Sequence, residues 1–419
     1  MQVYAIISEY NPFHNGHQLH IEAARRNGAT HIVAIMGGNF LQRGDCALLD
    51  KHRRARAALA GGADLVVELP LPYACATAER FAFGGVGLAD GLGCVSRLSF
   101  GSECGDTQLL LSAARAVDDP AVNDRMRALL AEGMTFARAR QQAVTQCISP
   151  QVGQVLAQPN NTLGVEYTRA LLRRGSDIGI HTIQRQGAGH NSSAPVGGIA
   201  SASYVRGLVK SNDGTFTRFL PGASAQEVTL AIAEGAAPAD LQHLERAILL
   251  KLRGMTHSEL AALPDISEGL EHRLFAAARS ATSLETLLAA LKTKRYPLSR
   301  LRRIVLCALL GVQADLCRLP PPYIRVLGFN DRGREVLAQA GKTAQLPVSH
   351  SLARLEELGG NPARFARLEA AAGDVFALLT PRAQPCGTEY RAKLVRGPLS
   401  QGECRHGLPV SNKQNEKKD

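Results

Sequence analysis

The beginning of the chain holds the feature that most restricts its fold, a short apolar run that leads into a histidine-rich turn. Val3 to Ile7 (VYAII) is nearly continuous in apolar residues, which is typical of a strand buried on both faces of a parallel sheet. A loop with Asn11-Pro12 follows, and apolar spacing predicts a helix from about Gly16 to Asn27, which Gly28 ends. This order favours an open α/β fold.

The same alternation of apolar runs and helical patterns continues along the first half of the chain. Strands and helices at this spacing predict a parallel α/β sheet with right-handed crossovers. The further predicted strands are His31 to Met36, Asp64 to Leu69, Val95 to Phe100 and Ile178 to Ile183, and the further predicted helices are Lys51 to Ala60, Ala74 to Ala89 and Asn161 to Arg174.

Changes of pattern divide the chain into three parts. From Asp106 to about Gln154 the pattern is helical, so we expect a helical insert within the sheet domain. After Asn212-Asp213-Gly214, repeated Ala, Leu, Glu and Arg indicate a mainly helical part with a small α/β piece near residues 320–380. The end of the chain is polar. We predict a sheet domain over 1–212 with an insert near 106–154, a mainly helical domain over 213–395 and a disordered tail over 396–419.

The charge and the cysteines narrow the class of protein. Lys and Arg total 48 against 37 Asp and Glu, a net charge of +11. This surplus favours a polyanionic partner such as nucleic acid, or an anionic substrate, although a basic proteome background also produces it. The nine cysteines form no C-x-x-C pair, which argues against a zinc ribbon and a disulfide framework. Since no signal peptide and no apolar stretch of about 18 residues is visible, we expect a cytoplasmic protein without a membrane span.

The turn His14-Asn15-Gly16-His17 has the features of a phosphate site. It lies between the first strand and the first helix, at the carboxyl edge of the sheet, where open α/β folds bind ligands. A helix N-terminus offers N–H groups to phosphate, the two imidazoles project to one side, and Gly16 allows close approach to the backbone. We predict that this turn binds a nucleotide's polyphosphate; the alternative is a pair of ordinary loop histidines.

A second polar segment, Ile199 to Arg206 (IASASYVR), supports this prediction. It places hydroxyl groups at the start of a predicted helix and Arg206 one turn further on. Ser201 can cap that helix, and the helix N–H groups can bind further phosphate oxygens together with Arg206. The alternative is a capped helix without a ligand.

The two segments together resemble the H-x-G-H turn and the late S-x-S-x-x-R of the HIGH superfamily of nucleotidyltransferases. The segments around them are similar to those of the tRNA(Met) cytidine acetate ligase family, from Met1 to about Leu337. The segments that carry this similarity are Gly37 to Gly44 (GGNFLQRG), Lys51 to Ala55 (KHRRA), Asp64 to Pro70 (DLVVELP), Phe100 to Glu103 (FGSE), Pro159 to Gly164 (PNNTLG), Arg185 to His190 (RQGAGH) and Lys294 to Arg303 (KRYPLSRLRR).

The resemblance implies a Rossmann-like sheet and a reaction in two steps. The family activates acetate with ATP to acetyl-adenylate and releases diphosphate. It then acetylates the wobble cytidine of elongator tRNA(Met) to N4-acetylcytidine and releases AMP. The resemblance also implies ATP contacts at Ile7, Ser8, Glu9, Tyr10, Asn11, Pro12, Phe13, His14, Asn15, Gly16, His17, Gln18, Leu19, His20, Gly101, Asn160, Asn161 and Arg185. We add Ser201 and Arg206 because of the serine and arginine pattern described above.

The chemistry of these residues allows the same contacts but leaves alternatives open. Gly101 follows the fourth predicted strand and leaves room for adenine or ribose, yet an ordinary turn glycine has the same pattern. Asn160 or Asn161 can read adenine, with Asn161 preferred, or can cap the following helix. Arg185 ends a predicted strand and can pair with phosphate.

No pair of carboxylates stands out as an acid–base couple, and none is needed because acetate is already anionic at neutral pH. The repulsion between acetate and the triphosphate must be offset instead. We predict that His14, His17 and Arg206 do so as catalytic residues, together with Mg²⁺. The sequence assigns no metal-ligating residue and does not locate the acetate pocket.

Two basic clusters are predicted to contact tRNA. One lies on the predicted helix Lys51 to Ala60, and the other lies in the helical part and includes a tyrosine that can stack on a base. The alternative is a solvated helix face covered by long side chains. The predicted contacts are Arg53, Arg54, Lys294, Arg295, Tyr296, Arg300 and Arg303.

Two other functions are compatible with the ATP motifs. One is a small-molecule adenylyltransferase of cofactor synthesis, and the other is a non-catalytic protein that holds ATP and binds RNA. The large helical part and its basic cluster argue against the first, because a small substrate requires neither. The sequence does not indicate the oligomeric state.

Overall fold

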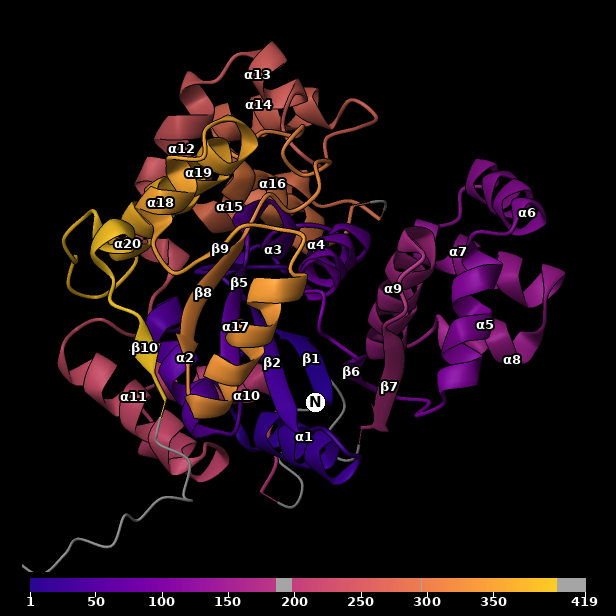
Figure 1. Cartoon of the computed structure of the whole chain (residues 1–419). Coiled ribbons are helices and arrows are strands. Elements are labelled where there is room, and N and C mark those ends of the chain that lie inside the picture. The colour runs from indigo at the N-terminus through magenta and orange to yellow at the C-terminus, as the bar shows by residue number, and fades with distance from the viewer. Residues whose placement is uncertain (186–197, 295, 398–419) are drawn as a thin grey trace, which may run out of the picture.

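A computed structural model describes residues 1–185, 198–294 and 296–397 of the chain, and it places one large sheet at the centre (Figure 1). The strand order is β10-β8-β5-β2-β1-β6-β7, with β9 paired to β8. All neighbours are parallel except β5 and β8. The strands are β1 (Val3–Ser8), β2 (His31–Gly37), β5 (Leu65–Leu69), β6 (Arg97–Ser102), β7 (Gly179–Gln184), β8 (Ile324–Phe329), β9 (Val348–Ser349) and β10 (Val395–Arg396).

The predicted α/β class is confirmed, and helices cover both faces of the sheet. Alternate residues of β1 enter two different cores, since Tyr4 and Ile6 pack with α1 and α2 while Ala5 and Ile7 pack with α4. The helices connected with the sheet are α1 (Asn15–Arg26), α2 (Lys51–Ala60), α3 (Leu71–Ala74), α4 (Ala78–Gly91), α9 (Pro159–Arg174), α10 (Ala202–Lys210) and α17 (Asp331–Thr343).

Two local predictions were wrong. The helix predicted over Ala74 to Ala89 is divided into α3 and α4, because Thr77 caps a new helix by accepting a hydrogen bond from the Arg80 N–H. The strand predicted to end at Phe100 continues to Ser102, so Gly101 lies within β6 rather than after it.

Four helices occupy the stretch where an insert was predicted, and they lie beside α9 and β7 at one side of the molecule (Figure 1). Buried residues such as Leu110, Leu129 and Ala143 join these helices to the main core. The helices are α5 (Thr107–Val117), α6 (Pro120–Ala131), α7 (Phe136–Cys147) and α8 (Pro150–Val155).

The second half of the chain begins with helices, of which α12 to α16 share a core of their own at one end of the molecule (Figure 1). No helix of the described residues is long and apolar enough to cross a membrane. The helices are α11 (Gly222–Ala233), α12 (Glu245–Gly254), α13 (His257–Ala261), α14 (Leu270–Ser280), α15 (Leu284–Leu291), α16 (Leu298–Leu310), α18 (Leu352–Glu356), α19 (Gly360–Ala377) and α20 (Thr388–Arg391).

The chain then returns to the sheet, which the sequence did not indicate. The small α/β piece predicted near residues 320–380 is not separate, because β8 pairs antiparallel with β5 and covers the edge that β5 would otherwise expose. Arg396, predicted as the first residue of a disordered tail, is the last residue of β10. The rest of that tail, 398–419, lies outside the described residues, and the division at residue 212 stays a prediction.

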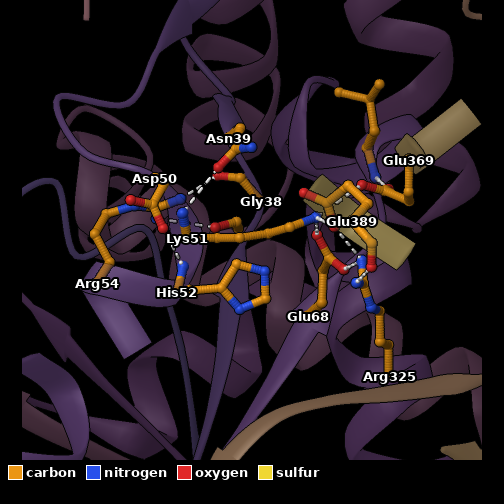
Figure 2. A network of polar contacts seen from close by, with 12 residues as sticks. Gly38, Asn39, Asp50, Lys51, His52, Arg54, Glu68, Arg325, Glu369 and Glu389 are labelled. Atoms are coloured by element: carbon orange, nitrogen blue, oxygen red, sulfur yellow. Dashed lines mark hydrogen bonds and ion pairs between the residues drawn. The ribbon is translucent and has the colours of Figure 1, made fainter. Parts of the chain in front are cut away.

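A buried cluster of charges fastens these C-terminal segments to the sheet (Figure 2). Lys51 Nζ pairs with Glu68, and it lies 2.8 Å from Glu389 Oε2 and 3.7 Å from Glu369 Oε2. Arg325 Nη1 lies 2.9 Å from Glu68 Oε2 and 2.6 Å from Glu389 Oε2. The five side chains come from α2, β5, β8, α19 and α20 and are at most 4% exposed.

The cluster holds two cations and three carboxylates, and one carboxylate is protonated. Burial, with the nearby charge of Glu68, raises the pKa of Glu369 to about 8. Burial also opposes ionisation of Glu389, but Lys51 and Arg325 outweigh it and lower the pKa of Glu389 to about 2. With Glu369 neutral at pH 7, the remaining charges balance.

We expect the stability of the protein to fall as pH rises from about 4.5 to about 8 and then to level off, because of Glu369. Its pKa in the folded chain is about 8 and lies above the 4.5 that is usual for a glutamate, so folding holds a proton that is lost at higher pH. Glu369→Gln mimics the protonated form and should lose less free energy of unfolding between about pH 6 and 9 than the unsubstituted protein. Urea unfolding at both pH values measures this, with the exposed Glu357→Gln as control. Equal pH dependence in both proteins would contradict it.

Candidate active site

The N-terminus of α1 is built by two histidines that cap each other. His14 is the N-cap residue, and its Nδ1 accepts a hydrogen bond from the Gly16 N–H at 3.1 Å. In return, the His14 N–H donates to His17 Nδ1 at 3.2 Å. The two rings stack with centroids 3.7 Å apart and planes at 22°. The structure therefore confirms that both imidazoles lie on the same side of the helix.

The same hydrogen bonds fix the protonation of both rings. Each Nδ1 accepts, so the ring proton of each histidine lies on Nε2, where it is available to an anion. Burial lowers the pKa of His14 to about 3, with Arg185 and Arg206 contributing, and burial holds the pKa of His17 well below its usual value. Both histidines are thus neutral hydrogen-bond donors at pH 7. The predicted offset of the substrates' negative charge must come from the arginines instead.

The loop before α1 is held in an unusual backbone conformation. Tyr10 has a φ of +46°, which is uncommon for a residue with a side chain and costs on the order of 1–3 kcal/mol. Its ring packs edge-on against His17 at 4.9 Å, and the buried Phe13 ring lies 5.6 Å from His17. The aromatic pair therefore orients the His17 ring from behind.

Arg206 approaches the same loop from α10. Ser201 caps this helix, as predicted, by accepting a hydrogen bond from the Tyr204 N–H at 3.2 Å. Arg206 Nη1 donates to the Asn11 carbonyl at 2.9 Å. Burial lowers the pKa of Arg206, and the nearby Glu9 counteracts this effect. Helix α10 thus brings a cation to the turn that precedes His14.

The two glycines of the predicted site make room for protein side chains. A Cβ on Gly16 would lie 2.9 Å from His14 Cε1, so Gly16 leaves space for the His14 ring, and the predicted close approach of phosphate stays a prediction. A Cβ on Gly101 would lie 3.1 Å from Arg185 Cγ, so Gly101 leaves space for Arg185. Both glycines are therefore needed to place the cationic and imidazole groups.

Asn160 and Asn161 open α9 and bind the end of β6. The Asn161 Oδ1 accepts hydrogen bonds from the N–H groups of Glu103 and Cys104 at 2.8 and 3.0 Å. The Glu103 carboxylate in turn accepts from both asparagine N–H groups at 3.2 and 2.7 Å. The Glu103 carboxylate, rather than either asparagine side chain, therefore caps the first turn of α9, so the capping alternative was wrong. Arg185 Nη1 donates to Asn160 Oδ1 at 3.5 Å, and adenine recognition by the asparagines stays a prediction.

These groups meet at one place in the sheet. Strand β1 has β2 on one side and β6 on the other, so the crevice beyond its carboxyl end is a topological switch point. Burial lowers the pKa of His14, His17 and His20, and the charge of Arg185 adds to this effect at each imidazole. The remaining predicted ATP contacts, Ile7, Ser8, Pro12, Asn15, Gln18 and Leu19, lie at the end of β1, in the following turn and on α1.

The structure removes Arg54 from the predicted tRNA contacts. Its side chain is fully buried, and its guanidinium donates to the carbonyls of Leu49, Glu9 and Gly37 at 3.1, 2.6 and 2.9 Å, and also to that of Gly38. A fully buried cation with four of its five N–H groups on backbone carbonyls is a structural group, because it is not accessible to a phosphate of tRNA. Its neighbour Arg53 pairs with Asp50, Glu227 and Glu234.

The second basic cluster is also partly internal. Arg303 donates to Asp265 Oδ2 at 2.9 Å, and Arg300 donates to the Asp265 carbonyl at 2.8 Å. Tyr296 is only 9% exposed, so its ring is not open for stacking on a base. Lys294 is exposed and lines a hollow of about 440 Å³ together with Arg273, Tyr296 and neighbours. Arg295 lies outside the described residues.

A hairpin that was not predicted joins the histidine turn to the helical part. Strands β3 (Phe40–Leu41) and β4 (Asp45–Cys46) flank Gln42, whose N–H donates to Glu9 Oε1 at 2.9 Å. Burial raises the pKa of Glu9. Gln42 also accepts from Arg303 Nη1 at 3.3 Å, and a Cβ on Gly44 would lie 2.4 Å from the Arg303 nitrogen. The glycine at position 44 was the sequence signal that could have indicated this hairpin, because a φ of +71° and the close approach to Arg303 both require glycine.

Comparisons with known proteins identify the family of the chain. The family model of the HIGH Nucleotidyl Transferases matches residues 1–390. A tRNA(Met) cytidine acetate ligase of Syntrophotalea carbinolica is 40% identical over 365 residues, covering 85% of this chain and 86% of the relative. A tRNA(Met) cytidine acetate ligase of a Thermoanaerobacter species is 34% identical over 404 residues, covering 94% of this chain and 100% of the relative.

Solved structures with the same overall fold are also similar in sequence to this chain. The apo crystal structure of Thermotoga maritima TmcAL has a TM-score of 0.90 to this chain at 32% identity, and covers 94% of this chain and 99% of its own. A second crystal form of that protein, bound with alpha-thio ATP, has a TM-score of 0.89 at 30% identity, and the match covers 95% of this chain and 100% of that protein.

Proposed function

The chain belongs to the tRNA(Met) cytidine acetate ligase family, within the HIGH nucleotidyl transferases, and from this premise we propose that it acetylates the wobble cytidine of elongator tRNA(Met). ATP and acetate are the proposed co-substrates. The observation that carries the proposal is the reciprocal histidine cap at the first helix of the sheet, which leaves the Nε2–H of two neutral imidazoles as donors beside the switch point.

The proposed first step is the activation of acetate. A carboxylate oxygen of acetate attacks the α-phosphorus of ATP, and the bond to the bridging oxygen breaks to release diphosphate and leave acetyl-adenylate. His14 and His17 donate hydrogen bonds to the phosphate oxygens, while Arg185 and Arg206 offset the charge that gathers there. Acetate is already ionised, so this step needs no general base.

The proposed second step transfers the acetyl group to tRNA. The exocyclic amine of the wobble cytidine attacks the carbonyl carbon of the adenylate, AMP leaves, and the amine loses a proton. AMP is a good leaving group, so protein groups need only hold the two reactants together.

Mg²⁺ is proposed only as a companion of the triphosphate. No group of three or more His, Cys, Asp or Glu side chains in the described ranges is arranged to hold a metal ion. Mg²⁺ in nucleotide sites commonly keeps several waters and binds through the substrate's phosphates, which requires few protein ligands. Neither of the two proposed steps is routed through it.

A single incubation separates this function from its two alternatives. The protein is mixed with ATP, labelled acetate, tRNA(Met) and a small phosphate ester, and the tRNA is digested and assayed for N4-acetylcytidine. Acetylated cytidine supports the ligase, and adenylylation of a small phosphate ester would indicate an adenylyltransferase of cofactor synthesis. Binding of ATP and RNA without turnover would indicate a non-catalytic protein. Acetate-dependent diphosphate release without tRNA isolates the first step.

The hollow beside Lys294 is the proposed tRNA contact in the helical part. Lys294→Glu should weaken tRNA binding about tenfold at moderate salt, because a phosphate contact is replaced by repulsion, and should lower the salt dependence of the affinity by about one ion. Acetyl-adenylate formation should be unaffected. Filter binding over a salt series measures this, with the exposed Lys342→Glu on α17 as a control of equal charge change. Equal loss in both variants would indicate a general charge effect.

A further inference from the structure

A third histidine of α1 is connected to two residues that the proposed mechanism does not use. The His20 Nε2 lies 2.9 Å from Ser99 Oγ on β6, and the same Ser99 Oγ lies 2.9 Å from His181 Nδ1 on β7. Ser99 is fully buried. The three side chains therefore form a continuous hydrogen-bonded row, from the phosphate-facing helix across two strands of the sheet.

The two histidines at the ends of the row are neutral. Burial lowers the pKa of His20 to about 4, with His181 and Arg185 contributing. Burial, together with Arg97, also lowers the pKa of His181, and its ring is held against the Tyr4 ring at a centroid distance of 5.5 Å. A neutral imidazole has one N–H donor and one acceptor nitrogen, and a serine hydroxyl has one proton. When the Ser99 hydroxyl donates its proton to one of the two rings, the row can therefore run in only two directions.

In one direction His181 Nδ1–H donates to Ser99, Ser99 donates to His20 Nε2, and the proton of His20 lies on Nδ1. In the other direction His20 Nε2–H donates to Ser99 and Ser99 donates to His181 Nδ1, so His20 Nδ1 carries a lone pair. Among the described residues no hydrogen bond to this Nδ1 is found. Phosphate oxygens only accept hydrogen bonds, so a bound triphosphate is compatible with the first direction and repels the second.

We infer that Ser99 and His181 form a relay that fixes the tautomer of His20, so that His20 presents its Nδ1–H to the triphosphate of ATP. The inference rests on the proposed ATP-binding function and deepens it. His20 lies three residues beyond His17 on α1, which places the two imidazoles on the same face of that helix. Ser99 and His181 are positioning residues, since they act through His20.

The test measures the affinity for a non-hydrolysable ATP analogue by calorimetry. Ser99→Ala removes the hydroxyl between the two rings and should weaken binding about tenfold, because one donor to a charged group is no longer held in place. The matched control is Ser102→Ala, which removes an equally buried hydroxyl from the opposite face of the same strand, where it contacts Thr182. This control should bind the analogue within about twofold of the unsubstituted protein.

A second pair of variants does not depend on the buried serine. His181 is half-buried, so it tolerates substitution. His181→Asn retains an N–H that can donate to Ser99 and should bind the analogue almost normally, whereas His181→Leu should resemble Ser99→Ala. A ¹⁵N spectrum of the histidine rings, with the His20 signals assigned by their loss in His20→Gln, should show the proton on Nδ1 in the complex.

The outcomes are separable. If the unsubstituted protein does not bind the analogue, the proposed function fails rather than the relay. If it binds and Ser99→Ala binds equally well, or Asn and Leu at residue 181 behave alike, or the complex carries the His20 proton on Nε2, the relay is overturned.

Discussion

His17→Ala is expected to lower the rate of acetyl-adenylate formation about a thousandfold, because a preorganised donor at the reacting phosphate is removed. The Nε2–H of this ring is fixed by the hydrogen bond that His14 N–H donates to its Nδ1 at 3.2 Å. Alanine removes both the donor and half of the helix cap. Diphosphate release with ATP and acetate, measured without tRNA, reports the chemical step, and tRNA affinity should stay nearly unchanged.

The lost cap has to be separated from the lost donor. Thr256 caps α13 in the same reciprocal manner, through Glu259, and α13 lies in the helical part of the chain. Thr256→Ala should therefore cost about 1 kcal/mol of stability without a comparable loss of rate. His17→Asn adds a second check, since its amide oxygen can still accept from the His14 N–H while its amide N–H is too short to replace Nε2. Near-normal turnover in His17→Ala would show that the phosphate site lies elsewhere.

The sequence was sufficient for those parts of the fold that local patterns determine. The apolar runs of β1, β2 and β5 and the turn that opens α1 were placed within a residue or two, because a strand buried on both faces and a helix N-terminus have their own signatures. The position of His14 and His17 on the same side of α1 also follows from their spacing. These features depend on neighbours in the chain.

Features that depend on distant partners were not accessible in the same way. The pairing of β8 with β5 requires two segments that no local signal connects. Arg54 was predicted to face tRNA because its neighbours are basic, yet its guanidinium donates to the carbonyls of Glu9, Gly37 and Gly38. The sequence around a cationic side chain does not show whether the side chain binds phosphate or a backbone carbonyl. The fold determines which of these groups lies within its reach.

Lys51→Met is expected to destabilise the folded protein by about 3–5 kcal/mol, a large fraction of the stability of an ordinary domain. Lys51 is 1% exposed and pairs with Glu68 and Glu389, both almost completely buried. Removing this cation leaves the two carboxylates with only Arg325, so one negative charge in the interior is uncompensated. Urea unfolding gives the free energy directly, and the three C-terminal elements that the cluster joins should become more susceptible to proteolysis.

Two comparisons test whether burial causes this effect. Lys210 forms an ion pair with Asp240 at 2.5 Å, but these side chains are 41% and 28% exposed, so Lys210→Met should cost less than about 1 kcal/mol. The double variant Lys51→Met with Glu68→Gln removes one charge of each sign and should recover part of the loss, because the interior is then balanced again. If Lys51→Met costs no more than Lys210→Met, or if the double variant is less stable than additivity predicts, the cluster does not hold the C-terminal strands to the sheet by charge balance.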